Sequence, residues 1–273
     1  MVKRRKTKIG AVSYLNTKPL VYQLDKLAIE SELMFDLPSR LADRLAASDL
    51  DIALIPSIEF FQNPSYTIVS DACIGCRGPV LSVKLFSRVP IAQIKTLALD
   101  EGSRTSIALV RTLLQERYGV VPRLESLPIG STVKDTAADA VLLIGDRAIH
   151  PPEGSFAATW DLGEEWQGWS HLPFVFAMWV ARPDVDWTGV DVALSTARDL
   201  GLEHLSEIAR AEAPAVDLTN EECLSYLRDN LYFYLGQREQ RGLDLFRRHA
   251  VHLGLAPPEC LDVSLAPADF VKL

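Results

Sequence analysis

The stretch Phe174 to Val180, FVFAMWV, is apolar throughout and rich in residues that favour β-strands. Before it, short apolar strands alternate with helical stretches, and after Pro183 the pattern changes to helix upon helix. A strand of this length in this place can carry the chain from a second α/β unit back to a first. The stretch therefore predicts two lobes joined by two crossings, with a ligand between them.

The apolar pattern on either side of this strand predicts the strands and helices of the two lobes. Strands are expected at residues 8–12, 32–37, 52–55, 80–87, 96–100 and 140–144. Helices are expected at residues 39–47, 103–118, 190–211, 219–236 and 238–253. Because strands that alternate with helices are typical of parallel sheets covered by helices, we predict an α/β protein. Residues 1–87 and 180–273 are expected to form lobe I, and residues 88–179 lobe II.

The charge of the chain disfavours nucleic acid and membrane surfaces as partners. Lys and Arg number 28 against 36 Asp and Glu, so the formal net charge is −8 and long-range attraction to polyanions is weak. No apolar run approaches the ~20 residues of a membrane span. The basic start, Met1 to Lys8, is not followed by the apolar core of a signal peptide. We expect a cytoplasmic protein that holds a small molecule through local donors.

Cysteine and histidine residues give no pattern typical of a metal or redox site. Cys73 and Cys76 form a C-x-x-C pair, but no second Cys/His pair lies near them. His249 and His252 have metal-compatible spacing but lack a third ligand. We therefore expect no metal and no cofactor. The oligomeric state is not indicated by the sequence.

Four segments in this order resemble the chorismate dehydratase family. They are VSYLNTKPL at residues 12–20, ALIPSIE at 53–59, GPVLSVKLFS at 78–87, and DLGEEW at 161–166 with LPFVFA at 172–177. The resemblance spans roughly residues 8 to 182. It implies a type II periplasmic-binding-protein-like fold with a ligand cleft between the lobes. It also implies loss of water from chorismate to give 3-enolpyruvylbenzoate, in menaquinone biosynthesis by the futalosine pathway, without a cofactor.

Two alternatives stay open beside this function. A sister family of the same fold, the 1,4-dihydroxy-6-naphthoate synthases, opens with a Ser-Pro-Cys-Pro-Asn-Asp type of segment, where this chain has Tyr14-Leu15-Asn16-Thr17. That family uses a histidine base at a position where this chain has Gly145. The other alternative is a non-catalytic cytoplasmic protein that binds small carboxylates, because a fold does not fix a function.

The resemblance points to Asn16 and Ser82 as the catalytic residues. The amide of Asn16 can both donate and accept hydrogen bonds to one bound substrate. Ser82 is expected in a strand with Leu81 and Val83 on the opposite face, so that its hydroxyl meets the cleft. The motifs contain no histidine, and we therefore expect the enolpyruvyl carboxylate of the substrate itself to act as the base, since fixed geometry can offset a poor pKa match.

Further residues are expected to bind the substrate. Residues 102–106, GSRTS, join a strand to a helix, where free backbone N–H groups and hydroxyls can hold an anion. Thr105 and Ser106 are the preferred partners of a carboxylate, whereas Arg104 is expected in solvent and Glu59 is given no role. The complete set of expected binding residues is Ser13, Tyr14, Thr17, Ser57, Ser103, Thr105, Ser106, Gly145 and Asp146.

Overall fold

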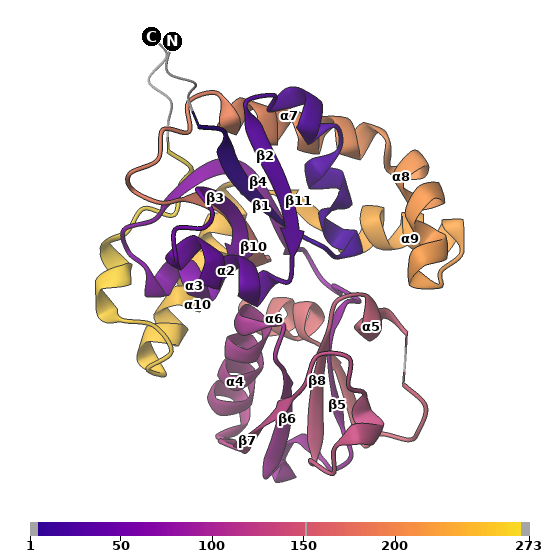
Figure 1. The fold of residues 1–273 in the computed structure, drawn as a ribbon. Coiled ribbons are helices and arrows are strands. Elements are labelled where there is room, and N and C mark those ends of the chain that lie inside the picture. Colours follow the sequence, from indigo (N-terminus) through magenta and orange to yellow (C-terminus); the bar gives the residue numbers. More distant parts are fainter. Residues whose placement is uncertain (1–4, 151, 269–273) are drawn as a thin grey trace.

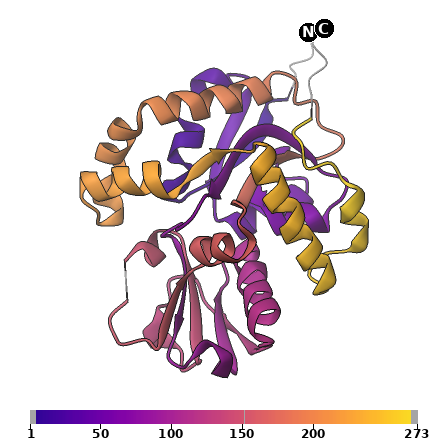
Figure 2. The ribbon, with the colours of Figure 1, turned by 180° about the vertical axis from the view of Figure 1, so that it is seen from behind.

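The computed structural model describes residues 5–150 and 152–268 of the chain, which form two β-sheets flanked by helices. The first sheet has the strand order β11-β4-β10-β3-β1-β2. Its strands are β1 (Thr7–Val12), β2 (Ser31–Asp36), β3 (Ile52–Pro56), β4 (Thr67–Cys76), β10 (Phe174–Ala181) and β11 (Tyr232–Tyr234). The second sheet lies apart from the first in both views of the ribbon (Figures 1 and 2), so the molecule has two lobes.

The second sheet has the order β7-β6-β8-β5-β9. Its strands are β5 (Val83–Ser87), β6 (Thr96–Asp100), β7 (Arg123–Leu127), β8 (Ala140–Ile144) and β9 (Ala158–Asp161). In both sheets, strands that continue a βαβ unit run parallel, but β10 is antiparallel to β3 and β4, and β5 is antiparallel to β8 and β9. Both sheets are therefore mixed, because strands that carry the chain between lobes enter each sheet from the opposite direction.

The chain changes sheet at other positions than expected. Residues 80–87 were expected as one strand of lobe I, yet β5 begins at Val83 and belongs to the second sheet. β10 was expected mostly within lobe II, yet it pairs with two strands of the first sheet. Both changes of sheet thus lie between strands, after Cys76 and after Asp161, rather than at Ser87 and Val180.

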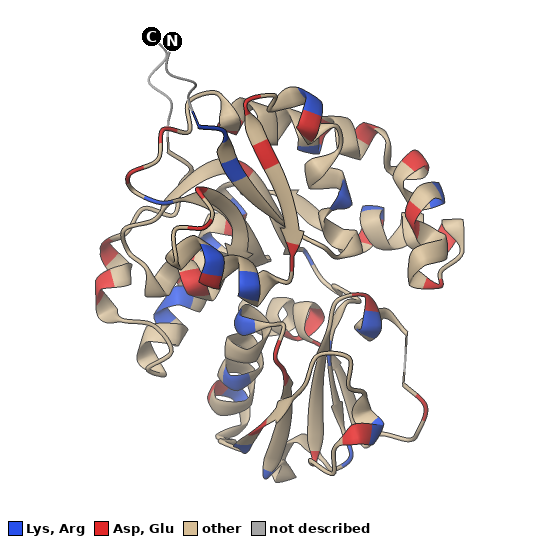
Figure 3. Cartoon of the chain, viewed as in Figure 1, with Lys and Arg blue, Asp and Glu red and all other residues tan. Residues whose placement is uncertain are grey.

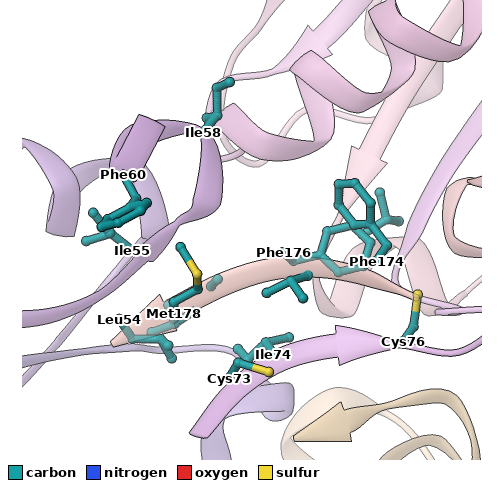
Figure 4. Packing of buried hydrophobic residues seen from close by; sticks show 14 of the residues in the cluster. Leu54, Ile55, Ile58, Phe60, Cys73, Ile74, Cys76, Phe174, Phe176 and Met178 are labelled. Atoms are coloured by element: carbon teal, nitrogen blue, oxygen red, sulfur yellow. The ribbon is translucent and has the colours of Figure 1, made fainter. Parts of the chain in front are cut away.

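Strand β10 is the centre of the first sheet and is buried along its full length. It pairs with β3 and β4 on its two edges, and Figure 4 shows Phe174, Phe176 and Met178 of β10 among buried side chains of these neighbouring strands. Phe174 also contacts Trp166 edge to face at 5.2 Å between ring centroids. A strand with buried residues on both faces explains why FVFAMWV has no polar alternation.

Ten α-helices cover the sheets in the described part of the chain. They are α1 (Leu24–Leu27), α2 (Pro38–Ala46), α3 (Ser57–Gln62), α4 (Arg104–Tyr118), α5 (Asp146–Ile149), α6 (Leu162–Ser170), α7 (Val190–Glu203), α8 (Leu205–Glu212), α9 (Asn220–Ser225) and α10 (Gln237–His252). Residues Leu15–Val21 form a 3₁₀-helix, η1, which follows β1 directly. Acidic and basic positions are mixed along the helices of both lobes in the view of Figure 3.

The helical tail departs from expectation between residues 219 and 236. The capping box of Thr219 and Glu222 begins α9 as predicted. The helix then ends after six residues and passes into a π-helical turn, Tyr226–Asn230, and into β11, which pairs with β4. The sequence suggested one helix here because the edge strand is short and its aromatic residues also suit a buried helix face.

Helix α7 packs on η1 with almost no space between their backbones. A Cβ atom added at Gly201 of α7 would lie 2.0 Å from the carbonyl oxygen of Pro19 in η1. We expect Gly201→Ala to lower the free energy of unfolding by about 2 kcal/mol or more, because the two backbones must separate. The gain in helix propensity, about 1 kcal/mol, is smaller. Urea unfolding measures the difference.

Gly168 of α6 is the matched control, because an added Cβ there meets nothing within 4 Å. Gly168→Ala is expected to leave stability unchanged or slightly higher. A Gly201→Ala protein as stable as the Gly168→Ala protein would contradict the close packing of α7 on η1.

Candidate active site

A cavity lies between the two lobes and is lined by residues from both sheets. Its walls come from the end of β1 and η1, the segment before β5, the beginning of α4, the end of β8 and the middle of β10. Besides Gly145, the residues with polar side chains that line it are Tyr14, Asn16, Ser82, Ser103, Arg104, Thr105 and Ser106. A cleft between two lobes with a few convergent polar groups is a common place for a small-molecule site.

Asn16 reaches the cavity because the chain leaves β1 through a tight 3₁₀-helix instead of an α-helix. Pro19 lies inside this helix. The 3₁₀ form keeps the turn narrow and places Asn16 at the lobe boundary. The Oδ1 atom of Asn16 accepts a hydrogen bond from Oγ1 of the buried Thr17 at 3.3 Å. Thr17 therefore lies behind Asn16 and does not line the cavity.

Ser82 also lines the cavity, although not for the reason the sequence suggested. It precedes β5, and Leu81 beside it has a left-handed backbone with φ of +65°. The amide of Ser82 donates to the carbonyl of Val80 at 2.7 Å in a tight turn, and its Oγ lies 3.4 Å from the same carbonyl. The expected alternation of Leu81, Ser82 and Val83 in a strand was therefore wrong. The orientation of the Ser82 hydroxyl at the cavity is set by this turn and not by the pleat of a strand.

The beginning of α4 brings Ser103, Thr105 and Ser106 to the cavity, but their donors are partly used. Ser103 is the N-cap and accepts a hydrogen bond from the amide of Ser106 at 3.3 Å. Oγ1 of Thr105 accepts one from the amide of Ile58 at 3.3 Å, and it lies 3.4 Å from Oγ of Ser57. The amide of Ser106 is therefore not the free donor that was expected.

Ser57 contacts Thr105 at the beginning of α4 and does not line the cavity. It is buried, and its Oγ donates to the carbonyl of Val175 on β10 at 2.8 Å. Together with Thr105 it joins the beginning of α3 in the first lobe to the beginning of α4 in the second. Its place in the fold is thus between the lobes, one layer behind the cavity wall.

Arg104 was expected in solvent, but its side chain borders the cavity and forms two ion pairs. Its guanidinium lies 2.7 Å from Asp43 and 3.1 Å from Glu59. Burial raises the pKa of Glu59, and Arg104 opposes that shift. Glu59, to which the sequence assigned no role, is only 8% exposed. The two carboxylates neutralise the positive charge of Arg104, so this edge of the cavity is polar but carries little net positive charge.

Gly145 has a conformation and a neighbour that exclude a side chain. Its φ is +67°, and a Cβ added there would lie 3.0 to 3.2 Å from three ring carbons of Tyr14. Burial and the nearby Asp100 raise the pKa of Tyr14 to about 12, so its hydroxyl stays protonated. Because Tyr14 fills the space beside Gly145, a histidine base at this position has no room without a change in both.

Asp146 and Ser13 hold the surrounding backbone and do not line the cavity. Asp146 accepts a hydrogen bond from the amide of Leu15 at 3.3 Å, which joins α5 of one lobe to η1 of the other. Burial raises the pKa of Asp146. Ser13 is exposed, and its amide donates to the carbonyl of Asp36 at 3.1 Å. The structure therefore gives no contact between these two side chains and the cavity.

The described residues that line the cavity include no His, Asp or Glu. His150 lies outside it, with Nε2 2.9 Å from the carbonyl of Val216, and His171 is exposed at the end of α6. The cavity is thus equipped to orient a ligand through an amide and hydroxyls, but it offers no residue of ordinary general-base type.

Metal-binding and membrane-spanning features are not found among residues 5–150 and 152–268. This part of the chain has no cluster of three His, Cys, Asp or Glu side chains that could hold a metal ion, and no helix that is long and apolar enough to span a bilayer. Cys73 and Cys76 are buried on β4, and burial raises the pKa of Cys76 to about 12. Neither thiol lines the cavity between the lobes.

The tail contributes a residue that the sequence did not suggest. Tyr226, at the π-helical turn, is 1% exposed and lies beside Asn16 and Ser82. No local pattern marks it, because a tyrosine in an amphipathic tail is most simply interpreted as a packing residue. Only the folded chain brings it to the site.

Comparison with known proteins places the chain among related sequences. It matches a protein family described as "Menaquinone biosynthesis" over residues 7–252. It is 31% identical over 267 residues to a chorismate dehydratase from Thermus thermophilus, covering 91% of this chain and 96% of that protein.

Two solved structures share the fold. A protein from Archaeoglobus fulgidus has a TM-score of 0.74 at 16% identity, covering 93% of this chain and 99% of that one. The periplasmic aliphatic sulphonate binding protein SsuA from Escherichia coli has a TM-score of 0.60 at 13% identity, covering 99% and 96%. At these identities the likeness shows the fold alone. The prediction of a two-lobed, periplasmic-binding-protein-like α/β fold is confirmed.

Proposed function

The chain belongs to the menaquinone-biosynthesis family, and from this premise we propose that it is a chorismate dehydratase. In this role it is a carbon–oxygen lyase that converts chorismate to 3-enolpyruvylbenzoate on the futalosine route. The observation that carries the proposal is the cavity wall: it presents Asn16, Ser82 and the hydroxyls at the start of α4, and its described lining has no acidic or imidazole side chain. Such a wall suits a reaction that needs positioning more than protein acid–base groups. A biosynthetic role also fits the predicted location in the cytoplasm.

The reaction removes a proton and a neighbouring hydroxyl from the ring of chorismate. The C–H bond at the ether-bearing carbon breaks, its electron pair completes the aromatic ring, and the C–O bond of the hydroxyl breaks. The proton and the hydroxide leave together as water. Negative charge that builds up during proton loss spreads to the ring carboxylate, so donors that hold this carboxylate stabilise the transition state. Ser103, Thr105 and Ser106 are our candidates for these donors.

We assign the base to the enolpyruvyl carboxylate of the substrate. This group lies within the same molecule as the proton, and a well-oriented intramolecular reaction can gain about 7–11 kcal/mol from fixed geometry. Tyr14 and Arg104 are the ionisable side chains among the described lining residues. A phenol with a pKa of about 12 stays protonated at neutral pH and cannot act as a base, and a guanidinium is already protonated and has no site that accepts a proton. The protein then has the task of holding the carboxylate against the C–H bond, which we assign to Asn16.

Incubation of the purified protein with chorismate tests this function. We expect the ultraviolet absorption of the diene to be replaced by that of an aromatic product, identified by NMR as 3-enolpyruvylbenzoate. Chorismate that binds without reacting would instead indicate a non-catalytic carboxylate-binding protein. Turnover of cyclic dehypoxanthinyl futalosine would indicate the naphthoate synthase, which the crowding of Gly145 by Tyr14 disfavours.

A further inference from the structure

The hydroxyl of Tyr226 is a buried polar group that the proposed reaction leaves unexplained. The side chain is 1% exposed, and its oxygen has no hydrogen bond of full geometry with any described residue. Buried hydroxyls are normally paired, because an unpaired one loses its contacts with water and gains nothing. A buried phenol without a hydrogen-bond partner is therefore either a packing residue, whose missing hydrogen bond the fold tolerates, or a residue with a function in the site.

The neighbours of this hydroxyl are the two residues assigned to chorismate. Ser82 and Asn16 both face it closely enough to act on its pKa as hydrogen-bond partners. Burial has the larger effect and raises that pKa, and Asp146 adds to it, so the phenol stays protonated. Tyr226 does not itself line the cavity, whereas Asn16 and Ser82 do. The hydroxyl therefore lies behind the cavity wall, beside the side chains of both Asn16 and Ser82.

The three residues come from three parts of the chain. Asn16 is on η1 beside the first sheet, Ser82 precedes the first strand of the second sheet, and Tyr226 begins the π-helical turn of the tail. The same turn is attached to the segment before β5, because Nδ2 of Asn230 donates to the carbonyl of Pro79 at 3.0 Å. π-helical turns are often found at functional sites. Here the turn places one phenol against both lobes.

The existing contacts of Asn16 and Ser82 leave room for such a partner. Among the described residues, Asn16 accepts from Thr17 at 3.3 Å and Ser82 donates to Val80 at 3.4 Å, both long for bonds that involve a hydroxyl. A phenol can donate one hydrogen bond and accept others, so it can serve an amide and a hydroxyl at the same time. Small rotations of these side chains, as a substrate enters, would complete the bonds.

We propose that Tyr226 is a positioning residue whose hydroxyl fixes the side chains of Asn16 and Ser82 from behind the cavity wall. The proposal rests on the proposed function, because it assigns Tyr226 a role in the same reaction. It also gives the helical tail a part in the site, beyond covering the first sheet. Tyr226 does not touch the substrate and does not move a proton.

The test is single-turnover conversion of chorismate by Tyr226→Phe, which removes one oxygen and keeps the ring. We expect the rate to fall about tenfold, chorismate binding to change less than about threefold, and the unfolding temperature to stay equal or rise, because an unpaired buried hydroxyl is lost. Tyr66→Phe is the matched control: Tyr66 is also buried, lies outside the cavity, and should keep the wild-type rate.

A double-mutant cycle separates positioning from packing. If Tyr226 acts through Asn16, adding Tyr226→Phe to Asn16→Ala should slow the reaction by less than about twofold further. Fully additive losses, a Tyr226→Phe rate within about twofold of wild type, or a fall in unfolding temperature with no effect on rate would each overturn the positioning role. A wild-type protein that forms no aromatic product would overturn the proposed function and this role together, whereas an active wild type with an unaffected Tyr226→Phe overturns the role alone.

Discussion

Asn16→Ala is expected to lower the single-turnover rate of chorismate dehydration by about a hundredfold, while chorismate binding weakens by less than about tenfold. The reason is geometric. The enolpyruvyl carboxylate is a weak base that works only when it is held against the ring C–H bond, and a displacement of about 1 Å can cost this much. The amide of Asn16 lines the cavity at the boundary between the lobes, where it can hold that carboxylate.

Two histidine variants are the controls for this prediction. His150→Ala and His171→Ala should keep turnover within about a few-fold, because neither side chain lines the cavity. The wild-type rate should also change little between about pH 6 and 8, since a histidine base would titrate near 6.5 and a substrate carboxylate would not. Near-normal turnover by Asn16→Ala, or loss of turnover in either histidine variant, would overturn the assignment of the base.

Ser82→Ala is expected to cost about 3 kcal/mol of transition-state stabilisation, or about a hundredfold in rate. Ser82 is 1% exposed and lines the cavity from the side of the second lobe. We propose that its hydroxyl assists the departing hydroxide or the shifting proton, where charge develops only in the transition state. Single-turnover rate and chorismate affinity, measured side by side, distinguish this loss from a loss of binding.

Ser87, the last residue of the strand that Ser82 precedes, provides a matched control. It is fully buried at the far end of β5, and its Oγ donates to the carbonyl of Val89 at 2.6 Å. Ser87→Ala should lower stability slightly, by about 1 kcal/mol, and leave the turnover of folded protein unchanged. Equal losses of turnover in Ser82→Ala and Ser87→Ala would show that Ser82 acts only through the fold.

Strand β10 and the beginning of α4 were predictable because their signals are local. β10 is apolar along its length since both faces are buried, and the Gly102-Ser103 turn leads into α4 with Ser103 as N-cap, as its residue types favour. The position of Ser82 in the cleft was predicted, yet its geometry was not. The turn at Leu81 requires a left-handed residue other than glycine, which no local preference indicates.

The contacts that cross between lobes were beyond sequence reasoning. The pairing of Arg104 with Glu59 and Asp43, and the place of Tyr226 beside Asn16 and Ser82, join residues far apart in the chain. A charged side chain or a tyrosine in a helix has a simpler local interpretation, and only tertiary packing overrides it. The absence of acidic and imidazole groups from the described lining is likewise a property of the folded cavity.

The role of the substrate carboxylate as the base is tested by comparing chorismate with its analogue in which the enolpyruvyl carboxylate is a carboxamide. Both are mixed with excess wild-type protein, and aromatic product is followed in a single turnover. If the substrate carboxylate is the base, chorismate is converted and the carboxamide, although bound, reacts at least about a hundredfold more slowly. Conversion of the carboxamide within a few-fold of the rate of chorismate would contradict the account, because the base would then belong to the protein.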